Sequence, residues 1–582
     1  MDDTVILKEP IVISTKKYHA RTTVFTSLNS ATVISGASKV KGWKKIDDRI
    51  WMASVEKDTA IISGFFLNGQ ERVRARTPDT GFFRMNGEMT EGDSLSFHYH
   101  TDDLRNKKYD DGEVVALLAW ADLRAKIITI DTTNERILLK GKKYPYNKEK
   151  NARYRIENSL ACLDNKGEWC HDPINGRLYY YPFDNEDPNV SDIRYSKLKH
   201  LMIINSDPDS SNGGTIIIRK LLFEASTANI GNNGYINIQS APDIDGGLEI
   251  RQGSQNIIVD SCVFNKMGGY GLNISGGSRG VRISNNVFVG MGAGGIKAGS
   301  KFNAPEKQRT SSINIVNNRI DSVGEFFPSS SGILVMKAAN TRIVSNWISN
   351  TFYTGISVGW TWGYGESQTD SNIIESNLVE DIGRGMMNDL GGIYILGVQP
   401  GTRISSNIIR RVTHENHTGM GIYLDEGSSD VLIENNFVDE ILEDCFYQNY
   451  GRNNRIINNI FADGHHAQMR VPYYKLNNMV DIKNNIIVSN VGDLYAGDWM
   501  GNTGVIDSNV YYCPSKDSLK LPGGNIAGWQ KKGNDLHSIF KKNIPGPTGS
   551  NISLSKLNET VPATGFRKIS FDPVLLKRAA AQ

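Results

Sequence analysis

The sequence lacks any long apolar stretch. No apolar run in its 582 residues reaches the length of about 18 that a membrane-spanning helix needs. The chain opens with Met1-Asp2-Asp3 and shows no basic segment followed by an apolar one, so no secretion leader is recognisable. We therefore expect no membrane span. The location stays open between the cytosol and export after removal of a leader.

Cysteine is scarce, and the five cysteines form no cluster with metal-ligand spacing. They are Cys162, Cys170, Cys262, Cys445 and Cys513. Cys162 and Cys170 flank a turn-like stretch and could form one disulfide, but the odd total favours free thiols in the core. We expect no metal site and no cofactor.

Neither sign of charge is in excess. The 65 basic and 63 acidic residues give a formal net charge of +2, without a long run of either sign. Because nucleic acid requires a basic surface, this balance argues against it as the principal partner. The oligomeric state stays open.

What the sequence does contain is a repeat. An asparagine closes a short apolar strand nine times, at intervals of 23 to 32 residues. These are Asn286, Asn318, Asn346, Asn377, Asn407, Asn436, Asn459, Asn485 and Asn509. A fixed period of this length indicates stacked units, and the unit holds β runs without an amphipathic helix. The pattern predicts an all-β protein built on a right-handed parallel β-helix, with asparagines that are structural and suit corners with left-handed backbone angles.

A second strand in each repeat begins with glycine and alternates in period two. Its aliphatic positions should point inward, and the residues between them should form an exposed column. That column reads Asn273, Lys297, Leu334, Ser357, Tyr394, Tyr423 and Tyr447.

The repeat does not extend over the whole chain. We expect residues 1–35 to start or cap the helix and 36–195, where the asparagine period vanishes, to form an inserted β-sandwich-like domain. Residues 196–515 should be the β-helix, and 516–582, rich in Gly, Pro and Lys, a cap or tail.

Longer repeats bring polar and aromatic residues to one face. Extra length in a solenoid goes into loops, here 298–312, 359–371, 383–392 and 412–420. Sugar rings stack on aromatic faces, and paired carboxylates suit cleavage of a glycosidic bond. We therefore predict a polysaccharide or oligosaccharide substrate. The predicted binding residues are Trp360, Trp362, Asn388, Tyr394, His414, His417, Tyr423, Tyr447, Gln448, His466 and Arg470, although both tryptophans could simply cover the solenoid.

Three motifs resemble one enzyme family. They are 389–397 (Asp-Leu-Gly-Gly-Ile-Tyr-Ile-Leu-Gly), 421–429 (Gly-Ile-Tyr-Leu-Asp-Glu-Gly-Ser-Ser) and 446–451 (Phe-Tyr-Gln-Asn-Tyr-Gly). With the upstream Arg74-Ala-Arg76, they resemble the β-helix enzymes of glycoside hydrolase family 141, which include α-L-fucosidases and xylanases. The resemblance implies Asp389 and Asp425 as the catalytic pair and a periplasmic or extracellular location. The loop 412–419 departs from the family pattern and leaves substrate preference open.

The implied pair meets a geometric difficulty. Along straight strands Asp389 and Asp425 would be offset by about 23 Å, whereas glycosidase carboxylates lie ~5–9.5 Å apart. The pair requires the 383–392 loop to fold back, and Glu415 and Glu426 are therefore alternatives. The turn that contains Asp425 could also be purely structural.

Two other functions stay open. A polysaccharide lyase or uronate epimerase would need positively charged groups at the site to bind an acidic sugar. Lys297 and Arg470 are available, but they lie far apart in the order of the coils. The Asp-Pro-His signature of C5-epimerases is absent from the sequence. A non-catalytic glycan-binding solenoid is the third possibility, which the number of carboxylates disfavours.

Overall fold

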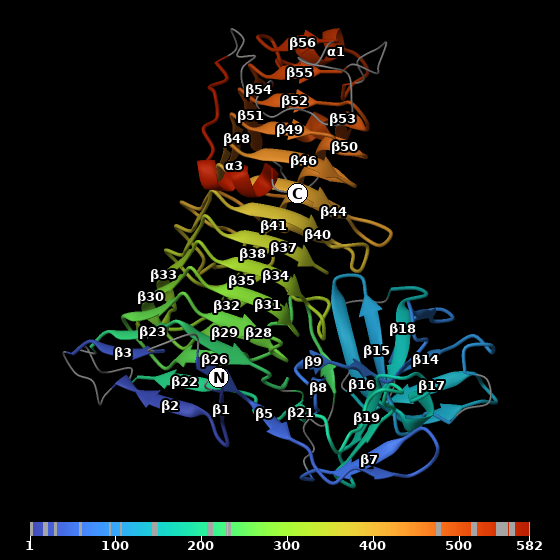
Figure 1. Ribbon diagram of the computed structural model, residues 1–582. Coiled ribbons are helices and arrows are strands. Elements are labelled where there is room, and N and C mark those ends of the chain that lie inside the picture. The colour runs from blue at the N-terminus through green and yellow to red at the C-terminus, as the bar shows by residue number, and fades with distance from the viewer. Residues whose placement is uncertain are drawn as a thin grey trace.

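A computed structural model describes the chain from residue 4 to residue 580, and it excludes several intervening segments. These are 16–20, 28–31, 58–60, 92–94, 105–107, 142–148, 207–213, 229, 231–233, 473–478, 514–520, 543–556 and 558–564. Within the described part the chain is almost entirely β, and Figure 1 shows a tall column of stacked strands with further sheets beside its lower coils.

The column consists of three sheets whose neighbouring strands run parallel. The first sheet contains β1 (Thr4–Ile6), β4 (Thr32–Ser35), β24 (Leu221–Glu224), β28 (Val263–Asn265), β31 (Val287–Met291), β34 (Arg319–Val323), β37 (Trp347–Thr351), β40 (Leu378–Ile382), β43 (Ile408–Val412), β46 (Phe437–Ile441), β49 (Ile460–Ala462), β52 (Ile486–Val488), β55 (Val510–Tyr512) and β56 (Ile539–Lys541). The second contains β2 (Ile11–Ser14), β22 (Met202–Asn205), β26 (Gly246–Arg251), β29 (Tyr270–Ile274), β32 (Ile296–Gly299), β35 (Ile333–Met336), β38 (Ile356–Val358), β41 (Leu390–Ile395), β44 (Gly419–Leu424), β47 (Asp444–Gln448), β50 (Ala467–Val471) and β53 (Asp493–Gly497).

The third sheet completes each coil. It contains β3 (Thr23–Thr26), β23 (Ile216–Arg219), β27 (Ile257–Asp260), β30 (Arg279–Ser284), β33 (Ser311–Val316), β36 (Arg342–Val344), β39 (Ile373–Glu375), β42 (Arg403–Ser405), β45 (Leu432–Glu434), β48 (Asn454–Ile457), β51 (Val480–Lys483) and β54 (Ile506–Asp507). The chain adds one strand to each sheet per coil, so the predicted parallel β-helix is confirmed.

The asparagines form a continuous ladder inside the column. The Oδ1 of Asn318 accepts hydrogen bonds from the backbone N and the Nδ2 of Asn286, at 3.0 and 2.9 Å, and the pattern repeats up to Asn509. The structural interpretation is therefore confirmed. The backbone expectation was wrong, because the left-handed angle belongs to the preceding residue, for example Asn285 with φ 58°.

The outward column on the second sheet has the predicted register but not the predicted exposure. Its members pair one above another from Asn273 to Tyr447, yet each is at most 7% exposed. The segment 235–244 covers the lower part, where Pro242 and Ile244 carbonyls accept hydrogen bonds from Lys297 Nζ. In the upper part the tyrosines pack against one another. Residues distant in sequence therefore bury a face that its own strands would leave open.

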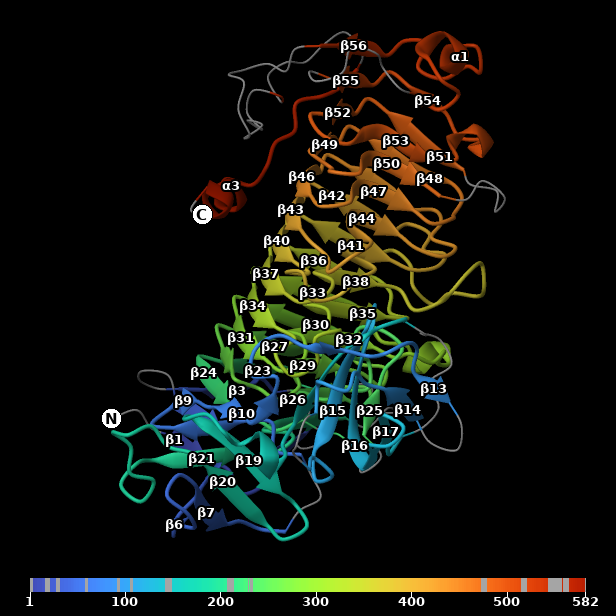
Figure 2. The same ribbon diagram turned by 90° about the vertical axis from the view of Figure 1, so that its right-hand side faces the viewer.

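Three smaller sheets form a side unit, which we define as β5 to β21 together with β25. Its strands are β5 (Ala37–Lys39), β6 (Lys44–Lys45), β7 (Trp51–Ser54), β8 (Phe65–Leu67), β9 (Gln70–Glu71), β10 (Val73–Arg74), β11 (Arg76–Thr77), β12 (Phe83–Arg84), β13 (Thr90–Glu91), β14 (Leu95–His98), β15 (Glu113–Leu118), β16 (Ala121–Asp131), β17 (Arg136–Leu139), β18 (Arg153–Glu157), β19 (Glu168–Asp172), β20 (Arg177–Tyr180), β21 (Ile193–Ser196) and β25 (Tyr235–Ile236). Figure 2 shows this unit against the lower coils of the column. The boundaries of the four predicted segments stay a prediction.

The far end of the chain turns back on the column. After α1 (Ile526–Gln530) and β56, the helix α3 (Pro573–Ala580) lies beside β40 and β43 (Figure 2), where the Ala579 carbonyl accepts a hydrogen bond from Arg410. No helix in the described part is long and apolar enough to cross a membrane. All five cysteines are buried and free, which excludes the Cys162–Cys170 disulfide.

Candidate active site

The two aspartates lie at opposite ends of neighbouring strands. Asp389 immediately precedes β41 and has a left-handed backbone angle, φ 54°, while Asp425 immediately follows β44. A Cβ placed on Gly391 would lie 3.1 Å from the carbonyl oxygen of Ile393, two residues further on. An extended strand does not allow this approach, so the backbone bends at Gly391–Gly392. The straight-strand offset of about 23 Å therefore does not apply.

Tyr423 joins the two carboxylates. Its hydroxyl lies 3.1 Å from Asp389 Oδ1 and 3.2 Å from Asp425 Oδ1. The two carboxylate oxygens can be no farther apart than the sum of these distances, about 6.3 Å. The bend and the long tyrosine side chain thus bring the pair within the range of glycosidase carboxylates.

A phenol has a single proton, so Tyr423 can fully donate to only one of the two carboxylates. The hydroxyl is therefore shared between the two carboxylates, and its hydrogen bond to Asp389 stabilises the charged form of that group. Burial, followed by the charge of Asp425, raises the pKa of Asp389 to about 7. Asp389 nevertheless keeps part of its surface accessible.

Asp425 is held by three donors. Its carboxylate accepts hydrogen bonds from the hydroxyls of Tyr394, at 2.5 Å, and Tyr423, and from Asn449 Nδ2 at 2.9 Å. These donors stabilise negative charge on Asp425. The structure therefore places a carboxyl with a raised pKa, Asp389, beside a carboxylate that is held by three hydrogen-bond donors, Asp425.

Glu426 faces the other side of the same turn. Burial and the neighbouring Asp425 raise its pKa, and the Tyr450 hydroxyl donates to its Oε2 at 3.1 Å. It is half-buried and does not share the bridge between the aspartates.

Glu415 is used in an ion pair. Arg84 of the side unit lies 2.5 Å from Oε1, and Asn388 donates to Oε2 at 3.4 Å. Burial alone would raise the pKa of Glu415, but Arg84 and Arg153 outweigh it and lower the pKa. Such a carboxylate is held in its charged form between two structural units.

The neighbours of Glu415 also hold the loop in place. The Asn388 side-chain oxygen accepts hydrogen bonds from the backbone N of Asn416 and His417, and the Asn388 backbone donates to Ala119. His417 is exposed. His414 is nearly buried, with Nε2 3.2 Å from Glu443 Oε2.

The side unit thus reaches the site in a way that the sequence did not reveal. Ala119 lies at the tip of the β15–β16 hairpin and has φ 49°, and Arg153 donates to the Met386 carbonyl. Two further contacts were missed: Tyr353, which donates to the Asp389 carbonyl at 3.0 Å, and Asn449. Asn449 lies within the 446–451 motif, and membership of that motif was the only feature of the sequence that could have indicated its contact with Asp425.

Aromatic residues lie beside the Asp425 turn. Trp360 is 5% exposed and packs in the core, whereas Trp362 is 41% exposed with its ring 5.3 Å from Trp360. Tyr364 is 40% exposed, and its ring lies 5.7 Å from that of Tyr450. Gly363 between them donates to the Glu426 carbonyl at 3.2 Å, which places both residues near Glu426. Trp362 is exposed and packs on Trp360, whereas the Arg452 guanidinium lies 4.2 Å from the centre of the Tyr364 ring and covers it.

The remaining predicted residues lie on β47 and β50. Tyr447 packs edge-on against Tyr423 at 4.9 Å and lies under the Arg470 guanidinium. Arg470 is ion-paired with Glu443 and Asp444, and His466 with Asp444. Gln448 is fully buried, bonded to Gly451 and Asn454, and cannot face a substrate as we expected.

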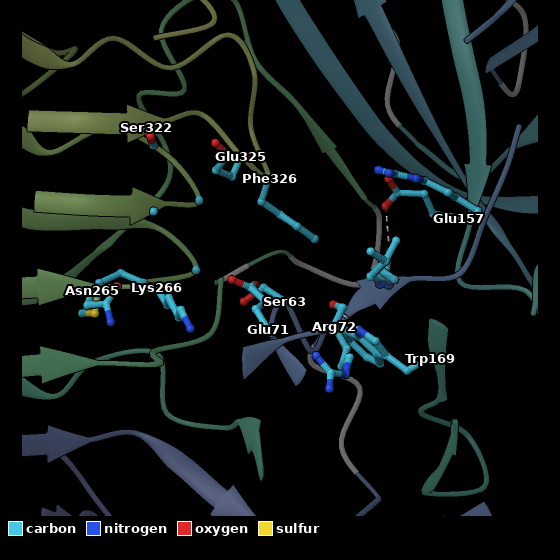
Figure 3. Close-up of a pocket in the computed structure, with 18 of the residues that line it drawn as sticks. Ser63, Glu71, Arg72, Glu157, Trp169, Asn265, Lys266, Ser322, Glu325 and Phe326 are labelled. Carbon is cyan, nitrogen blue, oxygen red and sulfur yellow. Dashed lines mark hydrogen bonds and ion pairs between the residues drawn. The ribbon is translucent and has the colours of Figure 1, made fainter. Parts of the chain in front are cut away.

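A separate cavity of about 430 Å³ lies between the side unit and the lower coils (Figure 3). Arg74, Arg124 and Arg155 at its wall all pair with Glu157, at 3.2, 2.7 and 2.6 Å. Their charge is partly compensated, and the lining of the cavity includes neither Asp389 nor Asp425. We therefore do not place the reaction in this cavity.

Comparison with known proteins supports the fold. A family model described as "right handed beta helix region" matches residues 366–510, which hold both aspartates, and it confirms the predicted handedness. No match was found among curated proteins.

Several solved structures are similar to this chain. A protein described as a glycoside hydrolase has a TM-score of 0.68 and 20% identity, and the alignment covers 80% of this chain and 88% of that one. XylC in complex with xylose gives a TM-score of 0.45 and 12% identity, over 93% and 81% of the two chains. A periplasmic alginate epimerase gives 0.35 and 16%, over 53% and 69%. At 20% identity, the likeness to the protein described as a glycoside hydrolase shows the fold alone.

Proposed function

We propose that this chain is a glycoside hydrolase that cleaves O-glycosidic bonds in a polysaccharide or oligosaccharide, with Asp389 as general acid and Asp425 as nucleophile. The observation that carries the proposal is the pair itself: two carboxylates that share the Tyr423 hydroxyl and lie no more than about 6.3 Å apart. Two such groups in different environments are what glycosidic cleavage requires.

Each carboxylate suits its role. Because the pKa of Asp389 is raised to about 7, it keeps a proton near neutral pH and can deliver that proton to the leaving oxygen. Asp425, which three donors hold in place, can attack or stabilise the anomeric carbon. The separation favours the retaining geometry of about 5–5.5 Å over the inverting one of about 6.5–9.5 Å.

The substrate class follows from the resemblance and from the site. The motifs around both aspartates are similar to those of glycoside hydrolase family 141, so α-L-fucosyl and xylosyl linkages are the first candidates. The exposed Trp362 side chain offers a platform for a further sugar ring beside the pair. The similar fold of the protein described as a glycoside hydrolase supports the proposed reaction class. A periplasmic or extracellular location would fit a polysaccharide substrate.

The test begins with a screen of fucosides, xylosides, galactosides and acidic oligosaccharides. On the best substrate, Asp389→Asn and Asp425→Asn should each lower turnover by at least about a thousandfold, since each removes one half of the mechanism. An activated aryl glycoside separates the roles, because a good leaving group needs no acid: Asp389→Asn should recover on it and Asp425→Asn should not.

Asp430→Asn is the matched control, since this half-buried aspartate lies five residues after Asp425 and bonds to Asn453. Substantial turnover in Asp389→Asn on unactivated substrate would refute the assignment. An unsaturated product that absorbs in the ultraviolet would identify a lyase. Binding without turnover on every substrate would identify a glycan-binding protein.

A further inference from the structure

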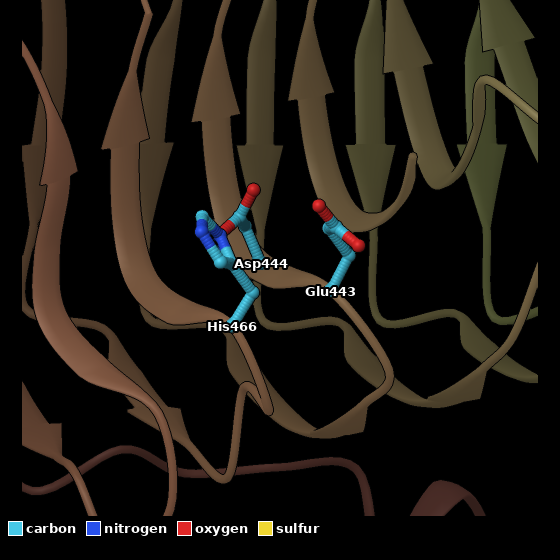
Figure 4. Close-up of side chains that lie close together, drawn as sticks. All are labelled: Glu443, Asp444 and His466. Atoms are coloured by element: carbon cyan, nitrogen blue, oxygen red, sulfur yellow. The ribbon is translucent and has the colours of Figure 1, made fainter. Parts of the chain in front are cut away.

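Two acidic residues and a histidine converge one coil above the catalytic tyrosine (Figure 4). Glu443 immediately precedes β47, Asp444 is its first residue, and His466 immediately precedes β50. One ligand atom from each lies within 4.8 Å of the others. Because Asp444 is in register with Ala467, the neighbours Glu443 and His466 face each other across adjacent coils. The parallel stacking thus builds the cluster.

The oxygens of the cluster are divided between two kinds of partner. Arg470 Nη1 lies 3.1 Å from Glu443 Oε1 and 3.3 Å from Asp444 Oδ2. The other oxygen of Asp444, Oδ1, lies 2.7 Å from His466 Nδ1. The guanidinium therefore orients the two carboxylates from one side and leaves an oxygen of each toward imidazole nitrogens, as outer partners of metal ligands do.

A second histidine provides an independent observation. The His414 side chain is 9% exposed, and neither of its ring nitrogens makes a hydrogen bond. Its Nε2 nevertheless lies 3.2 Å from Glu443 Oε2, the oxygen that Arg470 does not contact. A buried imidazole that faces a carboxylate but makes no hydrogen bond lowers the stability of the folded state. A third group that binds both side chains would remove this cost.

We propose that Glu443, Asp444 and His466 bind a divalent transition-metal ion, with His414 as the adjacent fourth ligand. Two carboxylates with one or two imidazoles form a donor set that suits Zn²⁺ and Mn²⁺ better than Ca²⁺, which takes oxygen ligands. Zinc with three protein ligands keeps a position open for water or another group. This site departs from our sequence-based expectation of no metal, because its ligands come from two coils and have no contiguous motif.

The site is linked to the aspartate pair but does not depend on it. Arg470 lies 5.4 Å from the Tyr447 ring, and that ring lies 4.9 Å from Tyr423. The ion would therefore stand at one end of the row of tyrosines, away from Trp362. Metal binding can be measured without any substrate, so its failure and the failure of the proposed hydrolase activity are distinguishable.

The experiment is equilibrium dialysis of chelator-treated full-length protein against ZnCl₂ and, separately, MnCl₂ and CaCl₂, with metal measured by elemental analysis. Wild type should bind one zinc ion per chain, with calcium at least tenfold weaker. Asp444→Asn and His466→Ala should each weaken zinc binding at least a hundredfold. His414→Ala should weaken it less, because three ligands remain.

His465→Ala is the matched control, since it removes the neighbouring exposed imidazole and should bind zinc as wild type does. The chain has ten histidines, so scattered weak binding would persist equally in all variants. Circular dichroism and melting temperature verify that each variant folds. Because His466 is exposed, its replacement by alanine should have little effect on packing. Equal zinc binding by wild type and His466→Ala, or equal loss in His465→Ala, would overturn the proposal.

Discussion

Replacement of Tyr423 by phenylalanine tests the shared hydroxyl directly. The ring, which packs against Tyr394 at 5.0 Å and Tyr447 at 4.9 Å, stays in place, and only the oxygen between the two aspartates is lost. A hydrogen bond to a charged group contributes about 1.5–3 kcal/mol. If that contribution is made in the transition state, kcat should fall by about 10- to 150-fold.

The same change should shift the pH profile. The Tyr423 hydrogen bond lowers the pKa of Asp389 against burial and the charge of Asp425. Its loss therefore raises that pKa further. Because a general acid must be protonated, activity disappears as pH rises through the pKa of Asp389. The descending limb of kcat/KM should therefore move to higher pH in Tyr423→Phe.

Steady-state kinetics from about pH 4 to pH 10 measures both effects. Tyr270→Phe is the control: Tyr270 is buried on the same sheet, and its hydroxyl donates to the Ser240 carbonyl at 2.7 Å, far from the aspartates. An unchanged kcat in Tyr423→Phe, or a descending limb that stays or moves to lower pH, would contradict the bridged-pair reasoning.

Three further predictions concern the ladder, the aromatic platform and a second carboxyl pair. Asn377→Ala leaves two buried donors of Asn346 without an acceptor and should lower the free energy of unfolding by about 3 kcal/mol, measured by denaturant unfolding; a loss below about 1 kcal/mol would contradict the ladder's role. Trp362→Ala should raise KM about fivefold, equivalent to about 1 kcal/mol, with little change in kcat, and a loss confined to kcat would speak against ground-state stacking. Burial and then Asp463 raise the pKa of Asp439 to about 8, so the folded state holds a proton that the unfolded state releases, and stability falls as pH rises from about 4 to about 8. Asp439→Asn should therefore melt a few degrees higher than wild type at pH 8 but not at pH 4, and equal shifts at both would refute this account.

The sequence was most informative where structure is local and repeated. The Asn286–Asn509 spacing predicted coils because each asparagine must meet the next one, and the alternation in strands such as β41 predicted which residues share a column. The asparagine spacing and the strand alternation depend only on contacts within a repeat and with the next repeat, and both are present in the structure. The left-handed angle was misplaced by one residue, because it falls on the residue before each ladder asparagine, which is Asn285 in one coil and Ser345 in another.

The site was less accessible to sequence reasoning for two physical reasons. A straight strand between Asp389 and Ile393 was assumed, and the bend at Gly391–Gly392 removes the offset that made the pair doubtful. Burial of the column is tertiary: Lys297 is covered by a segment more than fifty residues earlier in the chain. Gln448 was misplaced because a position on β47 next to Tyr447 faces inward, toward Asn454.

The contact between the side unit and residues 386–415 has a consequence for how the chain folds. The bonds that tie the side unit to this loop connect residues 233 to 331 positions apart, as in Arg153 with Met386 and Arg84 with Glu415. Since synthesis proceeds from the N-terminus and domains generally fold as units, the hairpin is made long before the loop that it will hold. The coils that contain residues 386–415 are synthesised later and then contact the side unit. Asp389 therefore acquires its final position only when the side unit and these coils come together.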